Sequence, residues 1–127
     1  MTEEKLVQLA DKIEERSAAG TMRWEQTASN NEFQTTLSSF VIRIVCSPGE
    51  NGIDYAIRLT DSNGEELESI TDVELSKLTR KISRGVNSKG GFEVMESIFK
   101  NAKRQALGVD KALDDILSEL DDEPPKT

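Results

Sequence analysis

The highest concentration of side chains able to do chemistry is a basic block in the C-terminal half of the sequence. Residues 77–111 carry nine basic and three acidic side chains, whereas the whole chain of 127 residues has a formal net charge of −8. Many of these basic residues recur three or four positions apart, so they share helix faces. Such a face binds phosphates of a nucleic acid or another anionic ligand. The candidate anion or partner contacts are Lys77, Arg80, Lys81, Arg84, Lys89, Lys100, Lys103 and Arg104.

The sequence around this block argues against a nucleic-acid partner. Residues 1–76 hold fifteen acidic and six basic side chains, and residues 112–127 hold six acidic and one basic. An acidic surround repels a second polyanion at short range. Charge runs on helices are also commonly solvated faces, or complements of acidic patches in the same fold or on a partner. Nucleic-acid or anionic-ligand binding through 77–104 is therefore the alternative hypothesis.

The segment 85–91, Gly-Val-Asn-Ser-Lys-Gly-Gly, invites comparison with a phosphate-binding loop. A P-loop places Lys and then Ser or Thr directly after its second glycine, on a turn from strand to helix. Gly91 and Phe92 stand at those positions, and a predicted helix precedes the segment. We interpret the segment as a connector. Anion binding by its backbone amides beside Lys89 stays an alternative.

The acidic clusters do not have the spacing of a metal or catalytic site. Residues 61–65 start like a calcium loop, but the glycine is fourth rather than sixth and Asp72 replaces the glutamate at position twelve. The Asn63-Gly64 pair by itself predicts a tight hairpin turn. The carboxylates at 65–68 and 114–115 lie in hydrophilic turns or on helix faces, and nothing in the sequence indicates a cleft around them.

Histidine is absent and cysteine occurs once. The chain therefore lacks the commonest general base and metal ligand, and it can form neither an internal disulfide nor a cysteine-rich zinc site. Cys46 alternates in phase with Ile42 and Ile44, where a thiol acts as a small apolar group. We predict no catalytic, cofactor-binding or metal-binding residue, and no cofactor.

The periodicity of apolar residues predicts the elements that position these groups. A helix is expected over 3–19, ended by Gly20, and strands over 22–27, 32–38, 40–46, 53–60 and 65–70. A capping box, Thr71 with Glu74, starts a helix that ends at Gly85, and two further helical segments follow at 92–107 and 110–120. Two points stay open: whether 32–46 is one bent strand or a hairpin, and whether Gly108 breaks the last helix.

This order predicts an α+β fold with an N-terminal helix, an antiparallel β-meander of four or five strands, and then two or three C-terminal helices packed on one sheet face. Residues 1–120 are expected to form a single domain, followed by a disordered acidic tail over 121–127. The expected core comprises Met22, Trp24, Phe33, Leu37, Phe40, Ile42, Ile44, Tyr55, Ile57 and Leu59, and the last helix carries an apolar stripe of Leu113, Ile116, Leu117 and Leu120. The opposite sheet face offers Gln34, Thr36, Arg43 and Arg58 as candidate contacts with a partner.

These observations favour a non-enzymatic small acidic binding protein that acts through protein–protein interaction, as an adaptor, an inhibitor or a chaperone-like protein. The expected partner is another protein, with a homo-oligomer included, and its identity does not follow from the sequence. The longest apolar run is three residues, so no membrane association is expected. A secretory signal is not visible, which favours a cytoplasmic location.

Overall fold

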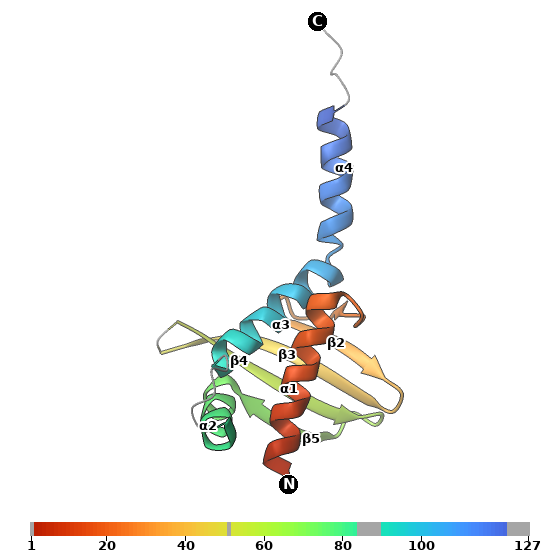
Figure 1. The fold of residues 1–127 in the computed structure, drawn as a ribbon. Helices are drawn as coiled ribbons and strands as arrows, with labels where there is room; N and C mark the ends of the chain where they lie inside the picture. Colours follow the sequence, from red (N-terminus) through yellow and green to blue (C-terminus); the bar gives the residue numbers. More distant parts are fainter. Residues whose placement is uncertain (1, 51, 84–89, 122–127) are drawn as a thin grey trace, which may run out of the picture.

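A computed structural model describes residues 2–50, 52–83 and 90–121. Figure 1 shows one sheet with helices on one face, and a last helix that extends away from the body. This is the predicted α+β fold, with three helices after the sheet. The elements in chain order are α1 (Thr2–Ala19), β1 (Glu25–Gln26), β2 (Glu32–Leu37), β3 (Phe40–Gly49), β4 (Gly52–Asp61), β5 (Glu66–Thr71), α2 (Asp72–Ser83), α3 (Gly91–Ala106) and α4 (Val109–Asp121).

The sheet is an antiparallel meander in the strand order β1-β2-β3-β4-β5. β2 and β3 form a hairpin whose last pair is Leu37 with Phe40, so residues 32–46 are a hairpin. Ser38 takes up the turn with a φ of 45°. At the next hairpin the Asp61 carboxylate accepts the backbone N–H groups of Asn63 and Glu65. The hairpin interpretation of residues 61–65 is thus confirmed.

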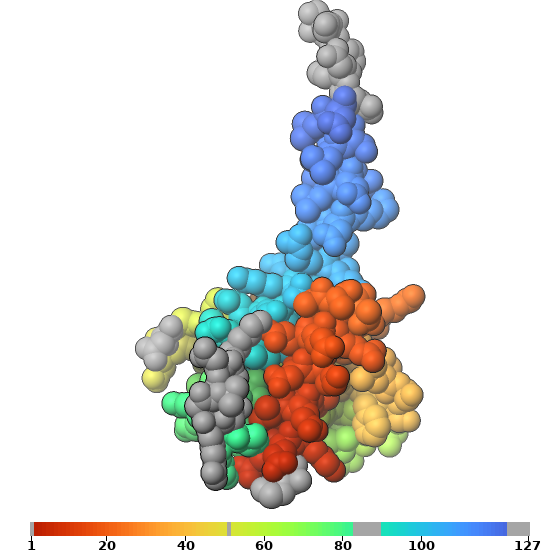
Figure 2. All heavy atoms as spheres, viewed as in Figure 1, coloured from red at the N-terminus to blue at the C-terminus, as the bar shows by residue number. Residues whose placement is uncertain are grey.

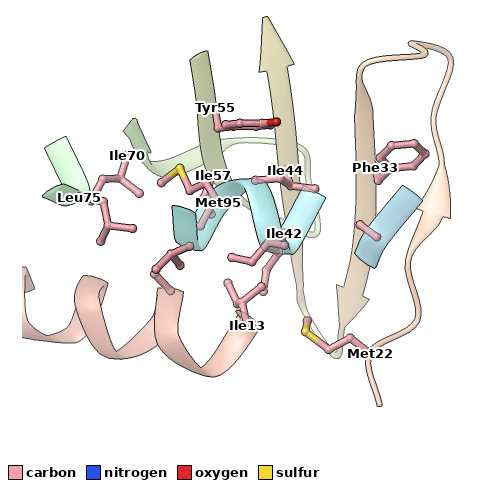
Figure 3. Packing of buried hydrophobic residues seen from close by; sticks show 14 of the residues in the cluster. Ile13, Met22, Phe33, Ile42, Ile44, Tyr55, Ile57, Ile70, Leu75 and Met95 are labelled. Carbon is pink, nitrogen blue, oxygen red and sulfur yellow. The ribbon is translucent and has the colours of Figure 1, made fainter. Parts of the chain in front are cut away.

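The core lies between the sheet and helices α1, α2 and α3. One row of paired residues crosses four strands, Phe33 to Ile44 to Ile57 to Ile70, and all four side chains are buried. Met95 and Ile98 of α3 have no exposed surface. Figure 3 shows Met95 among the sheet side chains. Because successive strand residues point to opposite faces, this row fixes which side chains meet the helices.

Trp24 joins the end of α1 to the end of α3. It is 4% exposed, so its predicted core position is confirmed. Its indole Nε1–H donates to Ser17 Oγ over 3.0 Å, and its backbone N–H donates to Gln105 Oε1, also over 3.0 Å. A buried indole N–H needs such an acceptor. The loop between α1 and β1 is therefore held on both helices.

α2 begins at the predicted capping box. The Glu74 N–H donates to Thr71 Oγ1 over 3.1 Å, and the Thr71 N–H donates to Glu74 Oε1 over 3.0 Å. The first residue of α2, Asp72, is buried and accepts the Tyr55 N–H of β4. These bonds hold the start of α2 against the sheet.

Two core predictions are wrong. Leu37 is 47% exposed and Phe40 is 50% exposed. They pair with each other at the tip of the β2–β3 hairpin, which extends past the covering helices (Figure 1). Alternation assigned them to the correct sheet face, but no helix lies over that end of the face.

The apolar stripe of α4 also differs from the expected packing. The sequence left open whether two or three C-terminal helices cover the sheet, and only α2 and α3 do so. Gly108, with a φ of 65°, separates α3 from α4, so the last helix is indeed broken there. No residue of α4 is buried, because the helix extends away from the body instead of packing on the sheet (Figure 1).

Gly91 should be intolerant of any side chain. A Cβ there would overlap the Asp72 carbonyl oxygen and would lie 2.7 Å from the Ser76 nitrogen, both of which are backbone atoms of α2. We expect Gly91→Ala to lower the free energy of unfolding by about 1–3 kcal/mol, measured by chemical denaturation. Gly90→Ala is the matched control, because its Cβ would meet only Ser76 Oγ at 3.7 Å. Equal effects of the two substitutions would contradict this packing.

Candidate interaction surfaces

The most exposed apolar surface in the described residues belongs to α4. Figure 2 shows this helix as a column that stands clear of the body. Within the described residues it packs mainly on the end of α3, and its first turn, at Asp110 and Lys111, lines a small hollow shared with the end of α1. The four stripe residues are all exposed, to between 44% and 73%: Leu113, Ile116, Leu117 and Leu120. A helix of 13 residues with an uncovered stripe is marginal in isolation.

The rest of the α4 surface is acidic. The helix holds five carboxylates and one lysine, Lys111, which pairs with Asp115 over 3.0 Å on the face opposite the stripe. At 100° per residue, Asp114 and Asp121 flank the stripe on one side and Glu119 lies on the other. α4 is therefore an apolar ridge bordered by negative charge.

A groove lies between the second half of α1 and the β2–β3 hairpin. Its volume is about 490 Å³. The floor is formed by Leu9, Ile13, Met22, Thr35 and Ile42. Three of these, Ile13, Met22 and Ile42, appear at the α1 side of the core in Figure 3. The exposed Leu37 forms one wall, so the groove is an apolar hollow open to solvent.

The rim of this groove is basic. Its charged residues are Lys12, Arg16 and Arg23, and no carboxylate lines it among the described residues. Lys12 has a solvent-exposed pairing with Glu15 over 3.7 Å, which contributes little. Arg16 and Arg23 form no ion pair within the described part of the chain. Sequence analysis missed these residues, because Arg16 lies on α1, Arg23 lies in the loop that follows it, and no local pattern joins them.

The open sheet face contains the four predicted contact residues. Gln34, Arg43 and Arg58 are paired neighbours in one row, and Arg43 Nε donates to Gln34 Oε1 over 3.2 Å. Thr36 occupies the adjoining row beside Val41. Arg58 has an exposed partner, Glu66, at 4.0 Å. The structure thus brings these four residues together on one polar face. Two of them, Gln34 and Arg43, are hydrogen-bonded to each other.

The basic block does not form one surface. Lys77, Arg80 and Lys81 lie on α2, whereas Lys100, Lys103 and Arg104 lie on the C-terminal part of α3. Gly91 contacts α2, so at 1.5 Å per residue the α3 cations lie roughly 14–20 Å further along the axis. Arg84 and Lys89 lie outside the described residues.

Several members of the block are paired with acidic groups of the same chain. Lys81 Nζ lies 3.3 Å from Glu3 of α1, and Lys100 Nζ lies 3.8 Å from Glu96. Arg104 lies 3.4 Å from Asp110 across the turn at Gly108. These pairs are solvent-exposed, as the Lys12–Glu15 pair is, so each contributes little. Their positions agree with the interpretation that the basic residues complement acidic groups of the fold.

Cys46 is partly buried beside the core, on the sheet face where alternation placed it. Burial raises the pKa of its thiol, and the charge of Lys103 opposes part of that rise. The protonated thiol is therefore favoured, which makes this side chain a poor nucleophile near neutral pH. Within residues 2–50, 52–83 and 90–121, no three acidic or cysteine side chains gather as a metal site would require.

Comparisons with protein-family models, with curated proteins and with solved structures find no match. Among the described residues, no helix has the length and apolar character needed to cross a membrane.

The thiol provides a test of the packing around Cys46. We expect alkylation of the folded chain to rise with pH along a curve displaced to higher pH than that of the denatured chain. Lys103→Gln removes a charge that favours the thiolate, so it should displace the curve further, whereas Lys100→Gln should not. The pKa of the Cys46 thiol is higher in the folded chain than in the unfolded chain. The contribution of this thiol to the free energy of unfolding is therefore fully present below the ordinary thiol pKa. It is lost as the pH rises through the pKa of the folded chain. Identical curves for folded and denatured chains would contradict the burial.

Proposed function

We propose that this protein is a non-enzymatic protein-binding protein and that α4 is the element its partner contacts. The observation that carries the proposal is the exposed stripe Leu113, Ile116, Leu117 and Leu120, on a helix that projects from the body. Fully burying one such side chain contributes about 1.5–3 kcal/mol. A partner that covers the stripe gains this energy without rearranging the core.

The spacing of the stripe supports recognition as a helix. Its residues follow the i, i+3, i+4, i+7 pattern with which amphipathic helices fill apolar grooves. The carboxylates beside the stripe favour a groove with a basic rim, since charge complementarity selects the partner and its orientation. The partner surface that fits α4 best is therefore an apolar groove bordered by Lys or Arg.

Nucleic-acid binding receives less support. Its candidate residues are divided between α2 and the distant end of α3, and three of them are paired with carboxylates of the same chain. A continuous basic strip, which a polyanion would follow, is not present in the described part of the chain.

A photocrosslinking amino acid at position 117 should capture a discrete protein in cells that express this chain. The same amino acid at position 118 is the matched control, because Ser118 is one residue away on the polar face of α4. We expect crosslinked bands from position 117 that are absent or much weaker from position 118, with mass spectrometry to identify them. Indistinguishable patterns from the two positions would refute the assignment of α4 as a contact element.

The wild-type protein should not bind DNA or RNA in the micromolar range at physiological salt. Anisotropy of a labelled oligonucleotide, measured over a salt series, tests this expectation. If binding does occur, a variant with Arg80, Arg84, Lys100 and Arg104 changed to Glu shows whether the basic block is responsible. Each lost phosphate contact should reduce the slope of the logarithm of the binding constant against the logarithm of the salt concentration by about 0.7–0.9. Salt-sensitive binding that the reversed variant loses would favour the nucleic-acid alternative over the protein-binding proposal.

A further inference from the structure

We propose that α4 of one copy docks into the groove between α1 and the β2–β3 hairpin of a second copy, so that two chains exchange their α4 helices. This inference rests on the proposed function of α4 and names its partner. The chain carries both halves of a complementary pair: an apolar ridge bordered by acids and an apolar groove bordered by bases. An exchange of identical elements closes as a two-fold dimer and leaves neither half uncovered.

The dimensions of the two halves agree. Along α4, Leu113 and Leu120 are seven residues apart, which is about 10 Å of helix. Along the groove, Leu9 and Arg16 of α1 are also seven residues apart, about 10 Å. The exposed Leu37 and Phe40 extend the apolar surface at the hairpin end. Of the two residues wrongly predicted to be in the core, Leu37 thus lines the groove and Phe40 is its paired neighbour.

Charge decides between this arrangement and a pairing of two α4 helices. Each α4 has five carboxylates against one lysine, so two of them side by side repel each other. The groove instead presents Lys12, Arg16 and Arg23 to the flanks of the ridge, where Asp114, Glu119 and Asp121 lie. Opposite charges at the border of an apolar contact select this pairing and set its direction.

The connection between α3 and α4 argues against docking within one chain. Only Leu107 and Gly108 separate the two helices. The end of α3 is fixed, because Gln105 accepts the Trp24 N–H and the Ala106 carbonyl accepts the Gln26 side-chain amide. A reversal at a two-residue link would lay α4 along α3, whereas the groove is lined by α1, the following loop, β2 and β3, and by no described residue of α3. A second copy reaches the groove without this constraint.

Disulfide trapping identifies which chain's α4 occupies the groove. The chain has a single natural cysteine, so replacing it removes all background disulfides. In a Cys46→Ser background, one chain carries Leu37→Cys at the groove and a second, differently tagged chain carries Leu117→Cys on the ridge. Both positions are about half exposed, so the chains should fold, and Trp24 fluorescence checks that they do. We expect the mixed pair to form an interchain disulfide under mild oxidation. Ser118→Cys in place of Leu117→Cys is the matched control and should crosslink at least about tenfold less, since it lies on the polar face.

Sedimentation velocity with complementing variants supplies an independent measurement. Ile116→Asp with Leu120→Asp disables the ridge, and Arg16→Glu with Arg23→Glu disables the groove rim. We expect each variant alone to dimerise at least about tenfold more weakly than the wild type. An equimolar mixture should regain part of the dimer, because one of the two contacts in the mixed pair joins an intact ridge to an intact groove.

Each other outcome overturns the inference. Disulfides between two Leu117→Cys chains without the mixed product would indicate pairing of α4 with α4. In a further variant that carries Leu37→Cys and Leu117→Cys on the same chain, a bridge confined to that single chain would indicate docking within the chain. A monomeric wild type whose α4 crosslinks a different protein would end the exchange proposal but leave the proposed function standing. Absence of any crosslink that depends on position 117 would defeat both.

Discussion

Two hydrogen bonds of Trp24, to Ser17 and to Gln105, determine where the groove and the α4 ridge lie. Its indole is held by Ser17 of α1 and its backbone by Gln105 of α3, so one residue fixes the C-terminal ends of both helices. Met22, two residues earlier, is thereby placed in the groove floor. The same contacts place the end of α3, from which α4 extends after the turn at Gly108. A loss of these two hydrogen bonds would disturb both the groove and the position at which α4 begins.

The covered sheet face has a limited length, and this explains the exposed apolar groups. α1, α2 and α3 cover the row from Phe33 to Ile70, but not the hairpin end at Leu37 and Phe40. The fourth helix, α4, does not cover this end either, since it extends away from the body. Apolar surface that a chain leaves outside its own core is commonly an interaction site. In this protein it occurs as a groove and as a ridge, and their charges are opposite in sign.

Burial changes the pKa of several titratable groups in the described residues. Burial raises the pKa of the Cys46 thiol and of the Tyr55 hydroxyl, so both stay protonated near neutral pH. Burial and the neighbouring Glu14 carboxylate also raise the pKa of Asp11 on α1. The basic residues that initially suggested an anion site are instead partly neutralised by Glu3, Glu96 and Asp110. Their contacts tie α2 to α1 and α3 to the start of α4.

Local pattern in the sequence determined the element order, the capping box at Thr71, the Asn63-Gly64 hairpin and the inward row of the strands, because each depends on residues close together in the chain. It also marked the α4 stripe as apolar, but the same periodicity describes a helix against a core and a helix against a partner. Only the tertiary structure showed that the described part of the chain leaves this stripe exposed, since the space over the sheet is set by how three other helices pack. The groove likewise arises from residues between positions 9 and 42 that have no common local pattern. Periodicity reports which face of an element is apolar, and long-range packing alone decides what covers it.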